Sequence, residues 1–180
     1  MTEPFLLAMP GAPDVEGAWH ETAPVEFRDP AKSICLVPMT SRISAADRGL
    51  MTDEEIRADP AFLKSARANT SRNAVRRGTE GEYLSVRSNK TGMPATAMFF
   101  MAGREKLFDA LGIDPGEHYF IFITQDETLL ARKSDLHLSN IRRTTRNIKN
   151  KLASLYPEGC PVLATEVFVY DKDARKYKEA

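Results

Sequence analysis

One continuous apolar run constrains the fold of this 180-residue chain more than any other stretch. Residues 118–124 read HYFIFIT, a sequence of aromatic and β-branched side chains. Such side chains favour strands, and a strand that is apolar at consecutive positions is covered on both faces. We therefore predict a central strand over 118–124. Residues 125–127 read as a hairpin loop, and residues 128–132 read as the partner strand.

Other segments predict further strands. Residues 33–37 have the short apolar pattern of a buried strand, and residues 82–88 alternate between apolar and polar side chains. The last strand is expected over 162–170, with a charged tail after it. Residues 95–101 fit two structures. They form the return strand of a hairpin with 82–88, which we favour, or they belong to a helix that begins at Pro94.

Two helices are predicted between these strands. Asp59 is an acidic cap and Pro60 suits the first helical position, so a helix should begin there. We expect this helix to run to about Arg77 and to stop at Gly78, because glycine is common just past helix ends. A second helix is expected over 103–111.

The longest helix is predicted in the last quarter of the sequence. Ser139 or Ser134 would cap it, and it would end near Tyr156, before Pro157. Side chains that recur every three or four residues form one stripe facing the core. The residues of this stripe are Ile141, Thr145, Ile148, Leu152 and Leu155.

Together these segments predict an α+β fold. It is a single domain with a mostly antiparallel sheet of five to six short strands and about three helices packed on it. Residues 1–31 differ, because their five prolines exclude a long helix or a central strand. We predict a Pro-rich acidic N-terminal arm over 1–31 and a globular domain over 32–180. The arm would dock on the body, or on a second copy of the chain as a homo-oligomer, through Phe5, Leu6, Leu7, Trp19 and Phe27.

Several function classes lack their signatures. Basic and acidic side chains number 25 each, so the whole chain has no strong field to attract nucleic acid or a membrane. No signal peptide or membrane-spanning run is visible, which predicts a cytoplasmic protein without a membrane partner. Cys35, Cys160 and the three histidines show no metal-binding spacing, and no nucleotide-binding glycine motif occurs. We therefore expect no metal and no cofactor.

The zero net charge hides a strong segregation of charge. Residues 1–60 carry five basic and eleven acidic side chains, whereas residues 61–100 carry seven basic and two acidic. The helix predicted from residue 139 carries five basic side chains and no acid. Like charges three or four residues apart repel by about 0.2–0.5 kcal/mol a pair, so a helix that keeps them often has an anionic partner.

This pattern predicts a small non-enzymatic binding protein. Its basic helices, 61–77 and 139–151, would contact an anionic partner, either nucleic acid or an acidic protein surface. The residues predicted to make these contacts are Arg72, Arg76, Arg77, Arg87, Arg142, Arg143, Arg146 and Lys149. Two other interpretations stay open. The basic faces are simply solvated, or the acidic arm packs on them within the same fold and masks them.

Two rival functions come from other classes. A protein–protein interaction module, such as an immunity protein, an inhibitor or an adaptor, needs neither a catalytic signature nor a net charge. An enzyme with a dispersed site would use the paired carboxylates of Asp126 and Glu127, which with Lys133 nearby would suit magnesium. His118 is a candidate general base, although a histidine satisfied by backbone groups is the simpler expectation.

Overall fold

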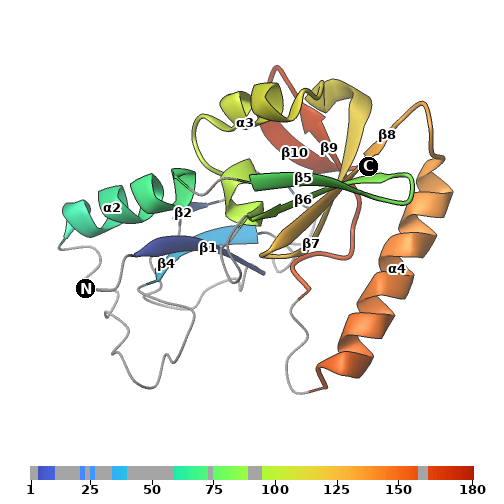
Figure 1. Cartoon of the computed structure of the whole chain (residues 1–180), viewed down its shortest axis with the longest axis horizontal. Helices are drawn as coiled ribbons and strands as arrows, with labels where there is room; N and C mark the ends of the chain where they lie inside the picture. Colours follow the sequence, from blue (N-terminus) through green and yellow to red (C-terminus); the bar gives the residue numbers. More distant parts are fainter. Residues whose placement is uncertain are drawn as a thin grey trace.

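The computed structural model describes residues 4–10, 21–22, 25–26, 34–39, 59–72, 75–88, 95–157 and 162–180. This part of the chain forms three α-helices and two sheets, and Figure 1 shows how they are arranged. None of the described helices is long and apolar enough to cross a membrane. The helices are α2 (Pro60–Ser71), α3 (Arg104–Leu111) and α4 (Leu138–Leu155).

The larger sheet confirms the predicted α+β class with a mostly antiparallel sheet. Among the described residues it has seven strands in the order β3-β10-β9-β7-β8-β6-β5. Neighbours are antiparallel except at one edge, where the short β3 pairs parallel with β10. The strands are β3 (Val25–Glu26), β5 (Val75–Glu80), β6 (Tyr83–Ser88), β7 (His118–Thr124), β8 (Glu127–Arg132), β9 (Phe168–Asp171) and β10 (Lys176–Glu179).

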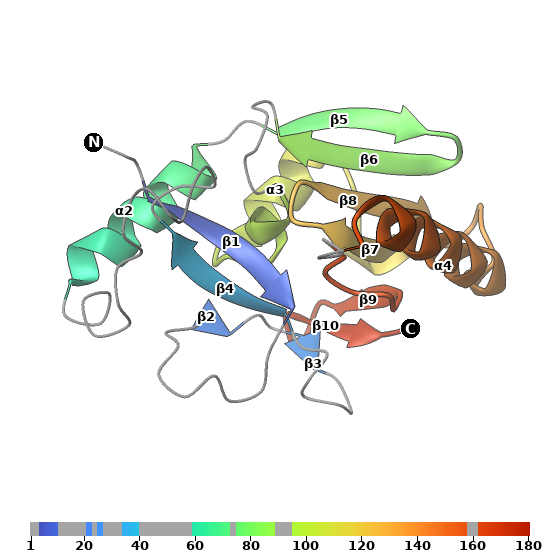
Figure 2. The same ribbon diagram turned by 90° about the horizontal axis from the view of Figure 1, so that it is seen from below.

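Strand β7 is central and covered on both faces, as its continuous apolar run predicts. Phe120 and Phe122 face one side, where each ring centroid lies 6.1 Å from that of Phe99. Ile121 and Ile123 face the other side and pack with α4. The sheet therefore separates two apolar clusters, and Figure 2 shows α3 and α4 on its opposite sides.

A smaller sheet has the order β1-β4-β2, with β1 (Phe5–Pro10), β2 (Glu21–Thr22) and β4 (Ile34–Met39). Helix α2 holds it, because the Thr70 hydroxyl accepts from the backbone N–H of Leu6 at 2.8 Å. Part of the predicted arm thus forms an edge strand, where proline is tolerated. The boundary at residue 31 stays a prediction, since most of residues 1–31 lies outside the described residues.

The first predicted helix is too long. Helix α2 begins as expected, with the Asp59 carboxylate accepting from two backbone N–H groups at 3.0 and 3.2 Å, but it ends at Ser71. The next described segment, Val75–Glu80, is strand β5 in a hairpin with β6. Gly78 lies inside this strand, and Gly81 makes the turn with φ +61°. Pairing with β6 therefore outweighs the helix propensity of the arginines.

The predicted return strand over 95–101 is also wrong. Residues Thr96–Phe99 form the 3₁₀ helix η2, and β6 pairs with β5 and β8 instead. The Thr96 hydroxyl donates to the carbonyl of Thr124 at 2.7 Å, and the Thr96 N–H donates to that of Gln125 at 3.0 Å. Because these bonds close the end of the β7–β8 hairpin, the segment cannot extend along β6. The helix expected over 103–111 is confirmed as α3.

The end of the described chain is a hairpin. The strand predicted over 162–170 is confirmed only for its last residues, and the prediction of a charged tail after it is wrong. Strand β9 starts only at Phe168, and the charged residues after it form β10. Tyr177 of β10 is fully buried, and its hydroxyl donates to the carbonyl of Phe99 at 3.2 Å. Lysines flank Tyr177, so the segment reads in the sequence as a charged tail rather than as a strand.

Candidate functional site

Helix α4 presents a basic surface because only one side of it packs on the sheet. Ile141 and Thr145 are buried, and Ile148 and Leu152 are partly buried against the cluster formed by β7 and β8. This confirms the predicted helix and most of its stripe. Leu155 is the exception: it is 62% exposed, because the last turn of α4 extends past the apolar cluster.

Four of the predicted site residues lie on the outer side of α4, away from the buried stripe. Helical spacing places Arg142, Arg146 and Lys149 along one side, with Arg143 beside them. Arg143, Arg146 and Lys149 are exposed, and they make no ion pair with an acid in the described part of the chain. The Arg142 guanidinium donates to the main-chain oxygen of Ala180, which ties α4 to the end of β10.

The other four predicted residues lie away from α4. Arg72 caps the end of α2, which packs beside the smaller sheet, and Figure 1 and Figure 2 show α2 and α4 at opposite ends of the molecule. Arg76 and Arg77 belong to β5 and Arg87 to β6. The structure therefore brings together the basic residues of α4 but does not join them to α2. Whether any of the eight residues binds a partner stays a prediction.

Two of the arginines outside α4 also have side-chain partners within the fold. One N–H of Arg77 donates to the carbonyl of Leu111, 2.6 Å away at the end of α3. Arg87 lies 2.6 Å from a carboxylate oxygen of Glu127 and 3.2 Å from one of Glu80. The hydrogen bond to Glu127, and after it the charges of the two carboxylates, raise the pKa of Arg87 above its ordinary value. Arg87 is thus partly neutralised without any external anion.

The carboxylate pair proposed for an enzyme does not converge with its lysine. Glu127 opens β8 and accepts from the Ser85 hydroxyl at 2.7 Å as well as from Arg87. Lys133 follows the other end of β8, about 20 Å along the strand, and donates to the carbonyl of Gly116 at 2.6 Å. No group of three or more potential metal-binding side chains occurs among the residues that the structure covers.

Both histidines within the described residues have structural positions. His118 is buried, and its Nδ1 lies 2.7 Å from the carbonyl oxygen of Asp114, which confirms the expected backbone contact. His137 is the N-cap residue of α4, so neither Ser139 nor Ser134 caps this helix. The His137 side chain makes no capping hydrogen bond.

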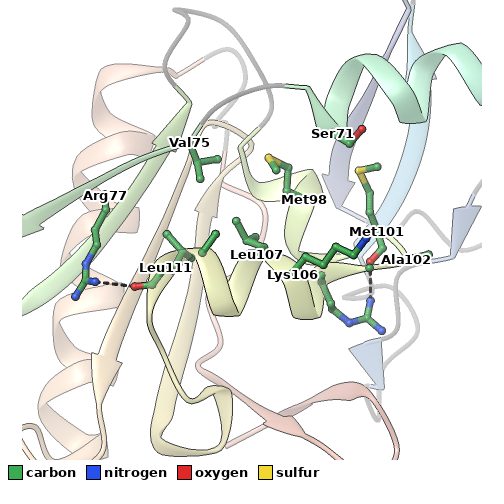
Figure 3. A pocket seen from close by; sticks show the side chains of 12 residues that line it. Ser71, Val75, Arg77, Met98, Met101, Ala102, Lys106, Leu107 and Leu111 are labelled. Carbon is green, nitrogen blue, oxygen red and sulfur yellow. Dashed lines mark hydrogen bonds between the residues drawn. The ribbon is translucent and has the colours of Figure 1, made fainter.

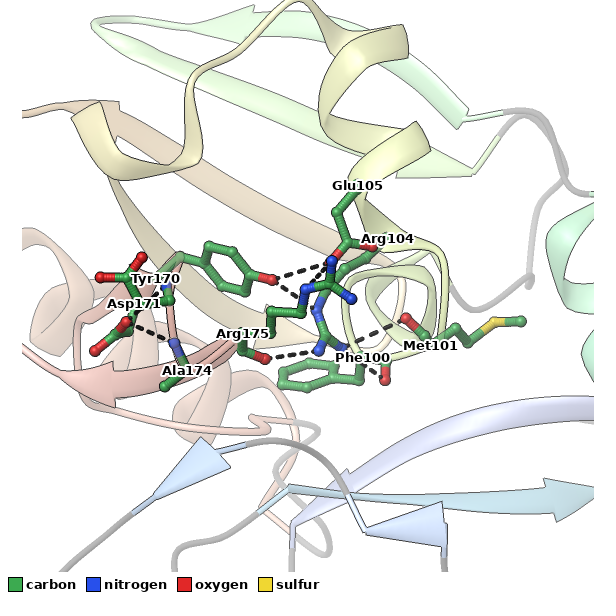
Figure 4. A network of polar contacts seen from close by, with 9 residues as sticks. Phe100, Met101, Arg104, Glu105, Tyr170, Asp171, Ala174 and Arg175 are labelled. Carbon is green, nitrogen blue, oxygen red and sulfur yellow. Dashed lines mark hydrogen bonds and ion pairs between the residues drawn. The ribbon is translucent and has the colours of Figure 1, made fainter.

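Sequence reasoning missed an arginine that joins three parts of the fold. Figure 4 shows Arg104, at the start of α3, beside the β9–β10 turn. It donates to the carbonyls of Phe100 at 3.2 Å and Arg175 at 2.7 Å, and to the Tyr170 hydroxyl at 3.3 Å. The last two partners lie more than 60 residues away, so no local pattern could indicate the contact.

Two exposed hydrophobic side chains at the end of α4 were also missed as surface features. Leu155 is 62% exposed and Tyr156 is 52% exposed, directly after the basic turns of the helix.

No protein-family model, curated protein or solved structure matches this chain.

Proposed function

We propose that this chain binds nucleic acid through the outer face of α4, which consists of Arg142, Arg143, Arg146 and Lys149. One observation carries the proposal. The 18-residue helix holds five basic side chains and no acidic one, and the exposed Arg143, Arg146 and Lys149 have no acid partner among the described residues. Arginine binds phosphate through two parallel N–H groups, which makes it a strong partner for a phosphate backbone.

The spacing of these cations suits a repeating anion. A helix rises 1.5 Å per residue, so Arg142 and Lys149 lie about 10 Å apart along its axis. One strand of a duplex carries a phosphate about every 3.4 Å, so this length faces about three phosphates. The exposed amides of Asn147 and Asn150 supply neutral donors beside the cations. Tyr156 offers an exposed ring on which one base of a single strand would stack.

A protein–protein module is the second candidate, and the exposed Leu155 favours it. An acidic protein surface would pair its carboxylates with the same cations, while Leu155 and Tyr156 would add an apolar contact at the end of the helix. The two candidates differ in their response to salt. Binding to phosphates weakens steeply with salt because counterions are released, whereas an apolar contact does not weaken in this way.

Fluorescence anisotropy with short single-stranded and duplex DNA and RNA tests the proposal. Three phosphate contacts on a duplex predict a slope of about −2.7 for log K against log salt, hence a roughly 40-fold loss of affinity between 50 and 200 mM. The Arg146→Gln/Lys149→Gln variant should reduce the slope by about 1.8, because each cation contributes about 0.9.

The matched control removes two cations elsewhere. Lys64→Gln/Arg72→Gln changes the net charge by the same amount on α2, and it should leave both affinity and slope close to those of the unmodified chain. If both double variants lose affinity to the same extent, binding depends on overall charge, and the assignment to α4 is refuted. No binding at 50 mM salt would refute the nucleic-acid proposal and leave the protein partner.

A further inference from the structure

A pocket lies on the face of the main sheet opposite α4. Its volume is about 590 Å³, which is within the range of small-molecule sites. Figure 3 shows it between the end of α2, the start of β5, η2 and α3. Its walls are mostly apolar, and the side chains that form them are Val75, Met98, Met101, Leu107 and Leu111.

The charged side chains around this pocket all have the same sign. Its charged lining residues are Arg77, Arg104 and Lys106. The acidic residues of α3, Glu105 and Asp109, do not line the pocket. A site with apolar walls, whose charged lining side chains are all cations, is complementary to a molecule with an apolar body and a negative end.

The three cations are not equally available. Arg104 is engaged with the carbonyls of Phe100 and Arg175 and with the Tyr170 hydroxyl, so it holds the wall in place. Arg77 donates one N–H to the carbonyl of Leu111, and its guanidinium makes no other hydrogen bond among the described residues. Lys106 is exposed and makes no ion pair with an acid in the described part of the chain.

We propose that this pocket binds a small amphipathic monoanion, an alkyl chain that ends in a carboxylate. The carboxylate pairs with Lys106, and Arg77 adds positive potential from the other end of the wall formed by Leu107 and Leu111, as Figure 3 shows. The alkyl chain lies on this wall and on Met98, whose unbranched and polarisable side chain adapts to different chain lengths. This site goes beyond the proposed function and is independent of it, because the main sheet separates the pocket from the outer face of α4.

Calorimetric titration with octanoate, decanoate and decanol at low ionic strength tests the site. Each methylene buried should tighten binding about fourfold, so decanoate should bind roughly 15-fold more tightly than octanoate. Lys106→Gln should weaken the binding of decanoate by about fivefold and leave the affinity for decanol unchanged, because only the carboxylate pairs with the ammonium group. Met98→Gln should weaken the binding of both decanoate and decanol.

The matched control is Lys64→Gln, which removes an exposed lysine of α2 that does not line the pocket. It should leave the affinity for decanoate within twofold. The proposal is overturned if no ligand binds, if decanoate and decanol bind equally to the unmodified chain, or if Lys64→Gln weakens decanoate as much as Lys106→Gln does. Thermal unfolding of each variant verifies that the fold is intact, which is expected because the side chains of Lys64 and Lys106 are exposed.

Discussion

Replacing Arg146 by glutamine should stabilise the protein. Arg146 lies four residues after Arg142, three after Arg143 and three before Lys149, and none of these cations has an acid on the same helix. Each like-charge pair costs about 0.2–0.5 kcal/mol, so relieving three pairs should contribute about 0.6–1.5 kcal/mol. Glutamine and arginine have nearly the same helix propensity, so the substitution leaves the helix otherwise unaffected.

Urea unfolding at two salt concentrations measures this effect. The Debye length is about 30 Å at 10 mM salt and about 3 Å at 1 M, so the gain in free energy of unfolding should be present at 10 mM and absent at 1 M. For a chain of this size the gain corresponds to a rise of roughly 2–5 °C in Tm at low salt. Arg87→Gln is a control that should change stability in the opposite direction. It breaks contacts with Glu80 and Glu127 and should lower the free energy of unfolding by up to about 1 kcal/mol.

Two results would refute this reasoning. If Arg146→Gln is no more stable at 10 mM salt, the cations of α4 do not repel each other and some acid must neutralise them. If the gain persists at 1 M salt, it is not electrostatic. Either result would also weaken the nucleic-acid proposal, which depends on an uncompensated positive face.

Three other perturbations have expected outcomes. Tyr177→Phe should cost about 1 kcal/mol at neutral pH, because it leaves the Phe99 carbonyl without its hydroxyl donor. Burial raises the pKa of Tyr177, so stability should fall as the pH rises above about 10, and a urea series from pH 8 to 11 should show a smaller fall in this variant. Lys172 lowers the pKa of Asp114, and the backbone N–H of Ala174 and then Lys178 lower that of Asp171. Stability should therefore fall as the pH drops below about 4. In the Asp114→Asn/Asp171→Asn variant, the urea midpoint should change less between pH 5 and pH 3. Gly112→Ala should cost about 1 kcal/mol because φ is +65° there, whereas Gly78→Ala, in open space within β5, should cost little by the same assay.

Local patterns were sufficient for elements whose periodicity is unambiguous. The apolar run of β7 and the stripe of α4 identified both elements and the faces they bury. The errors fall where a partner distant in sequence decides the structure. Strand β5 forms because β6 pairs with it, although its arginines favour a helix. Strand β10 is recognisable only through the burial of Tyr177, which depends on Phe99, 78 residues earlier.

The same limit applies to the candidate surfaces. The cations of α4 share one helix, so their spacing alone placed them on one face. The pocket could not be predicted in this way, because its walls come from α2, β5, η2 and α3. Its charge pattern exists only after folding, when the acids of α3 lie outside the pocket and Arg77 reaches the same helix from β5.

The charge of α4 is difficult to explain as an aid to folding. Its buried stripe already anchors the helix through Ile141 and Thr145. Of the cations on the outer face, Arg142 contacts Ala180, whereas Arg143, Arg146 and Lys149 add repulsion without an ion pair among the described residues. Acidic residues at one or two of these positions would create favourable pairs with the same neighbours and stabilise the helix. Natural proteins accept such losses where a function requires them. The repulsion measured at Arg146 would thus be the folding cost of a surface that an anionic partner neutralises.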